Sequence, residues 1–204
     1  MTKQKVFCVG FQKTGTTSLG MALEELGYKV GGYFDFRHLA KNLDLDISQL
    51  KKEIIENARK YDAVKDTPYP IFYEELDKEF PNSKFILVVR NADSWLRSVI
   101  NDFGDHDNAI HRLIYKSAHP SGNEGDWVSR YNQHNSDVIA YFSGNPDRLL
   151  VLDISKGEVS WKPICDFLGL PVPDRPWPHA NSKTKKMLKM RYWKLQNKLR
   201  LRND

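Results

Sequence analysis

The chain has 204 residues, of which 40% are hydrophobic and 28% charged, a composition that excludes a disordered or fibrous protein. This length can bury one α/β core, so we expect residues 1–204 to form a single domain. Two cysteines are too few for a disulfide framework. The first predicted strand begins near residue 5, and no apolar run approaches the ~18 residues of a membrane span. We therefore expect no signal peptide, no membrane span and a cytoplasmic location.

The first predicted strand, residues 6–9, leads into the segment Gly10-Phe11-Gln12-Lys13-Thr14-Gly15-Thr16-Thr17-Ser18, after which apolar residues recur at helical spacing. Main-chain N–H groups converge in a glycine loop of this kind, and the start of the following helix adds a positive partial charge. The pattern predicts an anion-binding loop. A plain turn is the alternative, but turn chemistry alone does not explain a lysine among several hydroxyl residues.

The loop differs from the nucleoside-triphosphate pattern Gly-x-x-x-x-Gly-Lys-[Ser/Thr] in the position of its cation. Gly10 and Gly15 keep the spacing and Thr17 stands at the hydroxyl position, whereas Thr16 replaces the lysine and Lys13 lies inside the loop. A nucleoside triphosphatase is expected to keep its lysine after the second glycine. The sequence therefore favours a different anionic ligand.

Beyond this loop, strands and helices alternate along the chain, which is typical of a three-layer α/β/α fold with a central parallel sheet. Further strands are expected at residues 27–34, 61–66, 84–90 and 148–153. Helices are expected at residues 35–60, 71–80, 128–143 and 161–169, with a helix that has Asp93 as its N-cap and a short helix near 109–118. Residues 101–127 otherwise read as a loop excursion and 171–178 as irregular structure.

The net charge of +5 is concentrated at the end of the chain, because residues 183–204 contain nine Lys or Arg and one acidic residue. Leu188, Tyr192, Leu195 and Leu199 share one face of a predicted helix there. We expect this basic helix to pack on the domain and expect no nucleic-acid partner. Binding of nucleic acid or of an anionic membrane surface is the alternative.

Arg90 ends the buried strand 84–90 and should lie at the same edge of the sheet as the glycine loop, because ligands bind at the carboxyl ends of parallel strands. A guanidinium can bind a phosphate through two hydrogen bonds, and the Ser98 hydroxyl can reach the same phosphate if the intervening turn is tight. The alternative is an ion pair of Arg90 with Asp93 and a solvent-facing Ser98.

The segment Lys13-Thr14-Gly15-Thr16-Thr17-Ser18 resembles the 5′-phosphosulfate-binding loop of the sulfotransferases. Arg90 and Ser98 resemble the 3′-phosphate site of that family, with Ala92 in place of its proline. The resemblance continues through residues 157–169 and 171–181, so that it covers about residues 5–182. Over this length the chain is similar to a single-domain sulfotransferase group. It implies the P-loop-like sulfotransferase fold, 3′-phosphoadenosine 5′-phosphosulfate (PAPS) as donor, PAP as product and no metal. In this family, basic residues that lie near the 3′-phosphate come after these segments in the sequence. Lys183 and Lys185 are therefore further candidates for binding the 3′-phosphate.

The segment Val64-Lys65-Asp66-Thr67-Pro68 is similar to the Lys-Thr-His-x-Pro segment of cytosolic sulfotransferases, in which the histidine is the catalytic base. Asp66 takes the place of that histidine, so the resemblance implies a carboxylate base that removes the acceptor's proton. Lys13 would stabilise the charge that builds on the leaving phosphate. The alternative is that Asp66 caps the helix that begins near Ile71.

Two further patterns are set aside. Residues 122–127 copy the Gly-x-x-Gly-Asp-Trp of the cytosolic enzymes' donor loop but lie too early in the chain. The clustered histidines do not have the spacing of a metal site, although one of them could line the acceptor pocket or serve as base. These candidates, with two residues that follow the second strand, are His106, His111, His119, His134, Asp35 and His38.

The sequence thus favours a PAPS-dependent sulfotransferase that moves a sulfuryl group to a hydroxyl or amine of a small-molecule or glycan acceptor. Residues 31–60 and 101–127 should set the acceptor, which the sequence does not identify, and it does not indicate the oligomeric state. A P-loop kinase that uses ATP and magnesium is one alternative. A non-catalytic module that binds a nucleotide or polyanion is the other.

Overall fold

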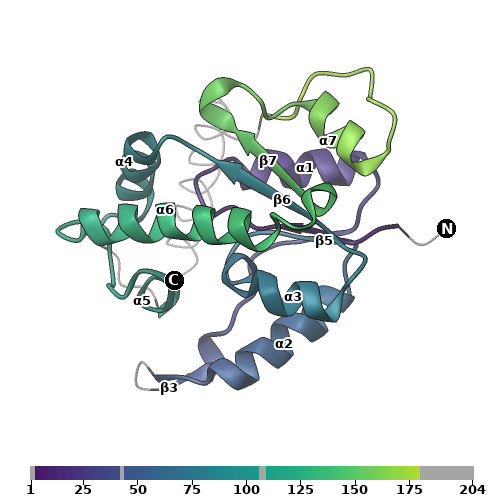
Figure 1. Ribbon diagram of the computed structural model, residues 1–204. Coiled ribbons are helices and arrows are strands. Elements are labelled where there is room, and N and C mark those ends of the chain that lie inside the picture. Colours follow the sequence, from purple (N-terminus) through teal and green to yellow (C-terminus); the bar gives the residue numbers. More distant parts are fainter. Residues whose placement is uncertain (1–2, 42–43, 106–108, 180–204) are drawn as a thin grey trace, which may run out of the picture.

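A five-stranded parallel sheet, in the order β2-β5-β1-β6-β7, forms the centre of the structure (Figure 1). The structure is a computed structural model that describes residues 3–41, 44–105 and 109–179. The strands of this sheet are β1 (Val6–Cys8), β2 (Val30–Gly31), β5 (Ala63–Val64), β6 (Lys84–Val89) and β7 (Leu149–Asp153). Two short antiparallel strands, β3 (Ala40–Lys41) and β4 (Asp44–Leu45), form a separate ribbon.

Helices cover both faces of the sheet, so that the molecule has three layers (Figure 1). Helices α1 (Thr16–Glu25) and α7 (Trp161–Leu168) lie on one face. The other face is covered by α2 (Ile47–Arg59), α3 (Tyr73–Glu79), α4 (Ala92–Phe103), α5 (Ala109–Tyr115) and α6 (Glu124–Tyr141). This arrangement confirms the predicted α/β/α fold with a central parallel sheet.

The two faces follow from the alternation of side chains along the central strands. Ile86 and Val88 of β6 pack under α1 and α7, whereas Phe85 and Leu87 point to the opposite layer, where Phe85 stacks on Phe7 of β1 with ring centroids 5.2 Å apart. Both faces of β6 are therefore buried, which explains its uninterrupted apolar sequence.

The order of the strands creates a switch point between β1 and β6. From β1 the chain crosses to β2 at one edge, and from β6 it crosses to β7 at the other. The loops that follow β1 and β6 therefore diverge and leave a crevice at the carboxyl ends of the strands, which is where doubly wound sheets bind ligands.

Several predicted boundaries were wrong. The segment 35–60 is α-helical only from Ile47, after a short 3₁₀ turn at Arg37–Leu39, because Asp46 caps α2 by accepting a hydrogen bond from the Gln49 N–H at 2.9 Å. Asn91, not Asp93, caps α4, since its side chain accepts from the Ser94 N–H at 3.1 Å and leaves Asp93 in the first turn. Helix α6 begins at Glu124, so that the sequence resembling a donor loop forms its first turn.

The predicted end of α7 at Gly169 is confirmed. Gly169 ends α7 in the left-handed conformation, at φ 66°. Within the described residues, no helix combines the length and the apolar character needed to cross a membrane. The predicted helix at the basic C-terminus lies outside the described residues.

Candidate active site

The loop between β1 and α1 has a main-chain path that depends on its glycines. A Cβ on Gly10 would lie 2.6 Å from the carbonyl oxygen of Val88, so this position admits only glycine at this distance from β6. Gly15 has φ 99° and is the N-cap residue directly before α1, and no described side chain caps that end of the helix. Lys13 also has a left-handed backbone, at φ 68°, a conformation that is strained for a lysine. The loop therefore reaches the start of α1 through two left-handed residues, Lys13 and Gly15.

Buried side chains hold the loop from behind. The His134 ring stacks on Phe11 with centroids 4.0 Å apart, and its Nε2–H donates to the Val9 carbonyl at 2.7 Å. Burial lowers the pKa of His134 to about 4, so that the ring is neutral at pH 7. Trp95 Nε1–H donates to the Gln12 carbonyl at 3.0 Å. These bonds fix the position of the loop relative to α4 and α6.

Thr14 takes part in this internal support. Its side chain is fully buried, and its hydroxyl donates to the Phe11 carbonyl at 2.7 Å. The hydroxyl therefore serves the turn itself, and the main-chain N–H is the group of Thr14 that remains for an anion. Thr16 and Thr17, in the first turn of α1, line the cleft described next.

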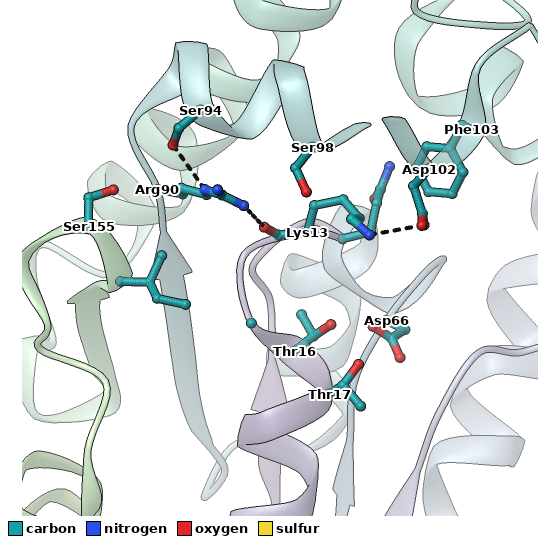
Figure 2. Close-up of a pocket in the computed structure, with 13 residues that line it drawn as sticks. Lys13, Thr16, Thr17, Asp66, Arg90, Ser94, Ser98, Asp102, Phe103 and Ser155 are labelled. Carbon is teal, nitrogen blue, oxygen red and sulfur yellow. Dashed lines mark hydrogen bonds and ion pairs between the residues drawn. The ribbon is translucent and has the colours of Figure 1, made fainter. Parts of the chain in front are cut away.

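A cleft of about 690 Å³ lies over the carboxyl ends of the strands. Its walls come from the loops that follow β1, β5, β6 and β7 and from α4 (Figure 2). The lining residues are Gln12, Lys13, Gly15, Thr16, Thr17, Asp66, Arg90, Ser94, Ser98, Asp102, Phe103, Ile154 and Ser155. The structure thus brings Lys13, Asp66, Arg90 and Ser98, which the sequence predicts from separate segments, into one cavity.

The Arg90 guanidinium points toward the glycine loop. Its Nε–H donates to the Ser94 hydroxyl at 2.9 Å, and its Nη1 donates to the Lys13 carbonyl at 3.2 Å (Figure 2). The Tyr131 hydroxyl clamps the main chain of Arg90, accepting from its N–H at 2.7 Å and donating to its carbonyl at 2.9 Å. Among the described residues, the partners of this guanidinium are Ser94 and the loop, and the alternative pairing with Asp93 is not formed. Arg90 and Ser98 both line the cleft.

Asp102 is a functional candidate that the sequence reasoning missed. Its Oδ2 lies 3.0 Å from Lys13 Nζ, with the two side chains 38% and 20% exposed (Figure 2). One signal was available, since Asp102 follows Ser98 by four residues and so shares its face of α4. Gln12, Ser94, Phe103, Ile154 and Ser155 also line the cleft without having been predicted.

Asp66 reaches the cleft from the end of β5. Its backbone is left-handed, at φ 65°, and its carboxylate pairs with the Lys65 ammonium. The Lys65 side chain crosses α1 at Gly20, where a Cβ would lie 2.5 Å from Lys65 Cε. The 3₁₀ turn and the helix that follow are capped by neither Asp66 nor another side chain, so the capping alternative is wrong.

The remaining candidates lie elsewhere. Ser18 is in the first turn of α1 and is not among the residues that line the cleft. His38 pairs with Glu53 at 2.8 Å, and the Nδ1 atoms of His111 and His119 bind nearby main-chain carbonyls. The described residues contain no group of three or more His, Cys, Asp or Glu that could hold a metal ion. Lys183, Lys185 and His106 lie outside the described residues.

A family model described as "Sulfotransferase domain" matches residues 5–127 and 100–186 of this sequence. The chain belongs to the sulfotransferase family. Family membership supports sulfuryl transfer as the general activity of this chain. The family's parallel α/β fold is also found here, as the sequence predicts.

The chain is also similar to three known proteins. The Ava biosynthesis cluster protein M of Aspergillus versicolor is 28% identical over 212 residues, covering 86% of this chain and 80% of that protein. A sulfotransferase from Alicyclobacillus acidocaldarius has the same fold, with a TM-score of 0.52 at 15% identity over 92% of this chain and 90% of that chain. The mouse sulfotransferase SULT7A1, complexed with PAP, gives a TM-score of 0.49 at 17% identity over 84% of this chain and 60% of that chain.

Proposed function

We propose that this sulfotransferase uses PAPS as its donor and transfers the sulfuryl group to a hydroxyl or amine of a small-molecule acceptor. The observation that carries this proposal is the hydrogen bond between Arg90 Nη1 and the Lys13 carbonyl. It joins two candidate anion-binding groups, which follow the neighbouring strands β1 and β6, in one cleft of about 690 Å³. A cavity of this size is typical for a ligand as large as a nucleotide.

The residues present suit the two charged ends of this donor. The N–H groups at the start of α1, with Lys13, Thr16 and Thr17, would hold the 5′-phosphosulfate. Arg90 and Ser98 would hold the 3′-phosphate, since a guanidinium has more N–H donors than its two protein hydrogen bonds use. Lys183 and Lys185 stay candidates for the same phosphate.

Within this proposal, Asp66 and Lys13 have different tasks. PAPS would supply the activated sulfuryl group. The Asp66 carboxylate would accept the proton that the acceptor loses, and Lys65 would keep that carboxylate in place. The Lys13 ammonium would stabilise the charge that builds on the phosphate when the sulfuryl group leaves. This mechanism uses no metal.

A kinase that uses ATP and magnesium is the second candidate. The observation that favours it is that Thr17, at the position of the magnesium-binding hydroxyl, lines the cleft together with two carboxylates. Against a kinase, this chain has Thr16 in place of the lysine that is expected after the second glycine. A kinase function would also give no role to Arg90 and Ser98.

Titration calorimetry with PAP and with ADP, each with and without magnesium, distinguishes the sulfotransferase from the kinase. PAPS use predicts that PAP binds at least about tenfold more tightly than ADP and that magnesium does not change its affinity, because one charge-assisted contact corresponds to about 1.5–3 kcal/mol. A kinase predicts magnesium-dependent binding of ADP and no benefit from the 3′-phosphate. Equal affinity for PAP and ADP would remove the role assigned to Arg90 and Ser98.

A further inference from the structure

The cleft contains an ion pair whose two members have opposite effects on an anionic ligand. Lys13 Nζ lies 3.0 Å from Asp102 Oδ2, and in Figure 2 Lys13 lies between Arg90 on one side and Asp102 on the other. Both side chains line the cavity. An anion that takes the Lys13 ammonium as its partner must therefore compete with Asp102 for it.

In this competition only the side chain of Lys13 changes position, because the loop holds its main chain. Arg90 holds the Lys13 carbonyl at 3.2 Å, and the lysine backbone is fixed in the left-handed conformation between two buried supports, Phe11 and Thr14. The main chain is thus set, whereas the four-carbon side chain can turn. The ammonium can reach either the α4 carboxylate or a ligand at the mouth of the loop.

The position of Asp102 in its helix favours the ion pair between its carboxylate and Lys13. Helix α4 ends at Phe103, so Asp102 lies in the last turn, and that turn contains no basic residue. A negative charge at the C-terminal end of a helix is unfavourable, because the helix dipole is negative there. Among the described residues, Lys13 is the cation within ion-pair distance of Asp102. Separating the pair therefore loses both the attraction and this compensation.

We propose that Asp102 is a positioning residue that pairs with the Lys13 ammonium and lowers the affinity for the donor and its product by competing for that ammonium. The proposal rests on the proposed function for the identity of the ligand, but the competition applies to any anion bound by the loop. Because both side chains are partly exposed, the effect is modest. We expect about a three- to tenfold change in affinity, the range of a partly exposed pair with a helix-end contribution.

The test is a double-mutant cycle read by calorimetry with PAP. The variants are Asp102→Asn, Lys13→Met and the double variant, with Asp105→Asn as control, because Asp105 is an exposed carboxylate that follows α4 and does not line the cleft. Asp102→Asn should tighten PAP binding about three- to tenfold when Lys13 is present. The same substitution should change it by less than about twofold in the Lys13→Met background, and Asp105→Asn should have no effect.

Two results would overturn the proposal. Equal tightening with and without Lys13 would mean that Asp102 acts only through long-range repulsion of the anion. Unchanged or weaker PAP binding by Asp102→Asn, in a variant whose thermal unfolding matches the parent, would mean that the pair does not oppose ligand binding. Inorganic pyrophosphate serves as a second probe. If PAP fails to bind but pyrophosphate shows the same cycle, the donor assignment fails and the role of Asp102 stands; if neither anion binds, both fail.

Discussion

Replacement of Arg90 by methionine should weaken the binding of PAP and leave the binding of AMP nearly unchanged. The variant keeps an unbranched apolar stem but removes the charge and both of its hydrogen bonds, to the Ser94 hydroxyl at 2.9 Å and to the Lys13 carbonyl at 3.2 Å. AMP has the adenosine and the 5′-phosphate but no 3′-phosphate, so it reports any damage to the glycine loop.

The size of the effect follows from the contact that is lost. A hydrogen bond to a charged group contributes about 1.5–3 kcal/mol, which corresponds to about a 10- to 100-fold change in the dissociation constant. The loss of the Lys13 contact could also loosen the loop, but that damage would weaken AMP as well. The difference between the two ligands therefore isolates the 3′-phosphate.

Calorimetry with the parent chain, Arg90→Met and Arg97→Met provides the comparison. Arg97 lies on the same helix, is exposed and does not line the cleft, so its replacement removes an equal charge without removing a contact. We expect PAP binding to be unaffected by Arg97→Met. An equal loss of PAP and AMP affinity in Arg90→Met would show that Arg90 supports the loop only, and unchanged PAP affinity would refute its role in the 3′-phosphate site.

Three further predictions concern the frame of the site. Gly10→Ala should lower the midpoint of thermal unfolding measured by circular dichroism, because its Cβ would lie 2.6 Å from the rigid Val88 carbonyl. Gly125→Ala, which has open space around it, should not lower the midpoint. An unchanged midpoint for Gly10→Ala would contradict the close packing. The pKa of His134 is lowered to about 4, so the unfolded chain binds its proton first, and the free energy of unfolding should fall by about 3 kcal/mol as the pH drops from about 6.5 to about 4. Between about pH 6.5 and pH 4, urea titrations should show a flatter stability profile for His134→Gln than for the parent, and an equal slope in both proteins would be against this assignment. Burial raises the pKa of the Cys8 thiol to about 12, so a thiol reagent at pH 8 should label Cys8 only after denaturation, and rapid labelling of the native chain would disprove its burial.

The sheet and its layers could be predicted because buried strands leave a clear pattern in the sequence. The run at 84–89 has apolar residues on both faces, and the structure places it inside the sheet, between β1 and β7. Strand ends then locate the site, since parallel strands bring Lys13, Asp66 and Arg90 to one edge. The single-domain organisation over residues 1–204 and the cytoplasmic location stay predictions.

Boundaries were harder to predict because several residues could serve the same purpose. Asn91 and Asp93 are both good N-caps, and the choice depends on the backbone angles with which the chain leaves β6. For α2, a cap signal was present in the pair Asp46 and Gln49, but leucines at helical spacing before it favoured a longer helix.

The Asp102 contact could not be derived from the sequence, because it depends on how α4 rotates about its own axis. The stacking of Trp95 on Tyr131, with centroids 4.2 Å apart, fixes that rotation through residues distant in the sequence. The same holds for Ile154 and Ser155, which reach the cleft because the Asn91 N–H donates to the Ser155 hydroxyl at 2.9 Å and joins the ends of β6 and β7.

The most direct test of the account is a crystal structure of the chain with PAP bound. We predict the 5′-phosphate at the start of α1, within hydrogen-bond distance of the loop N–H groups, and the 3′-phosphate in contact with the Arg90 guanidinium and the Ser98 hydroxyl. A nucleotide whose 3′-phosphate lies away from Arg90, or that binds outside the cleft over β1 and β6, would contradict the assignment of PAPS as the donor.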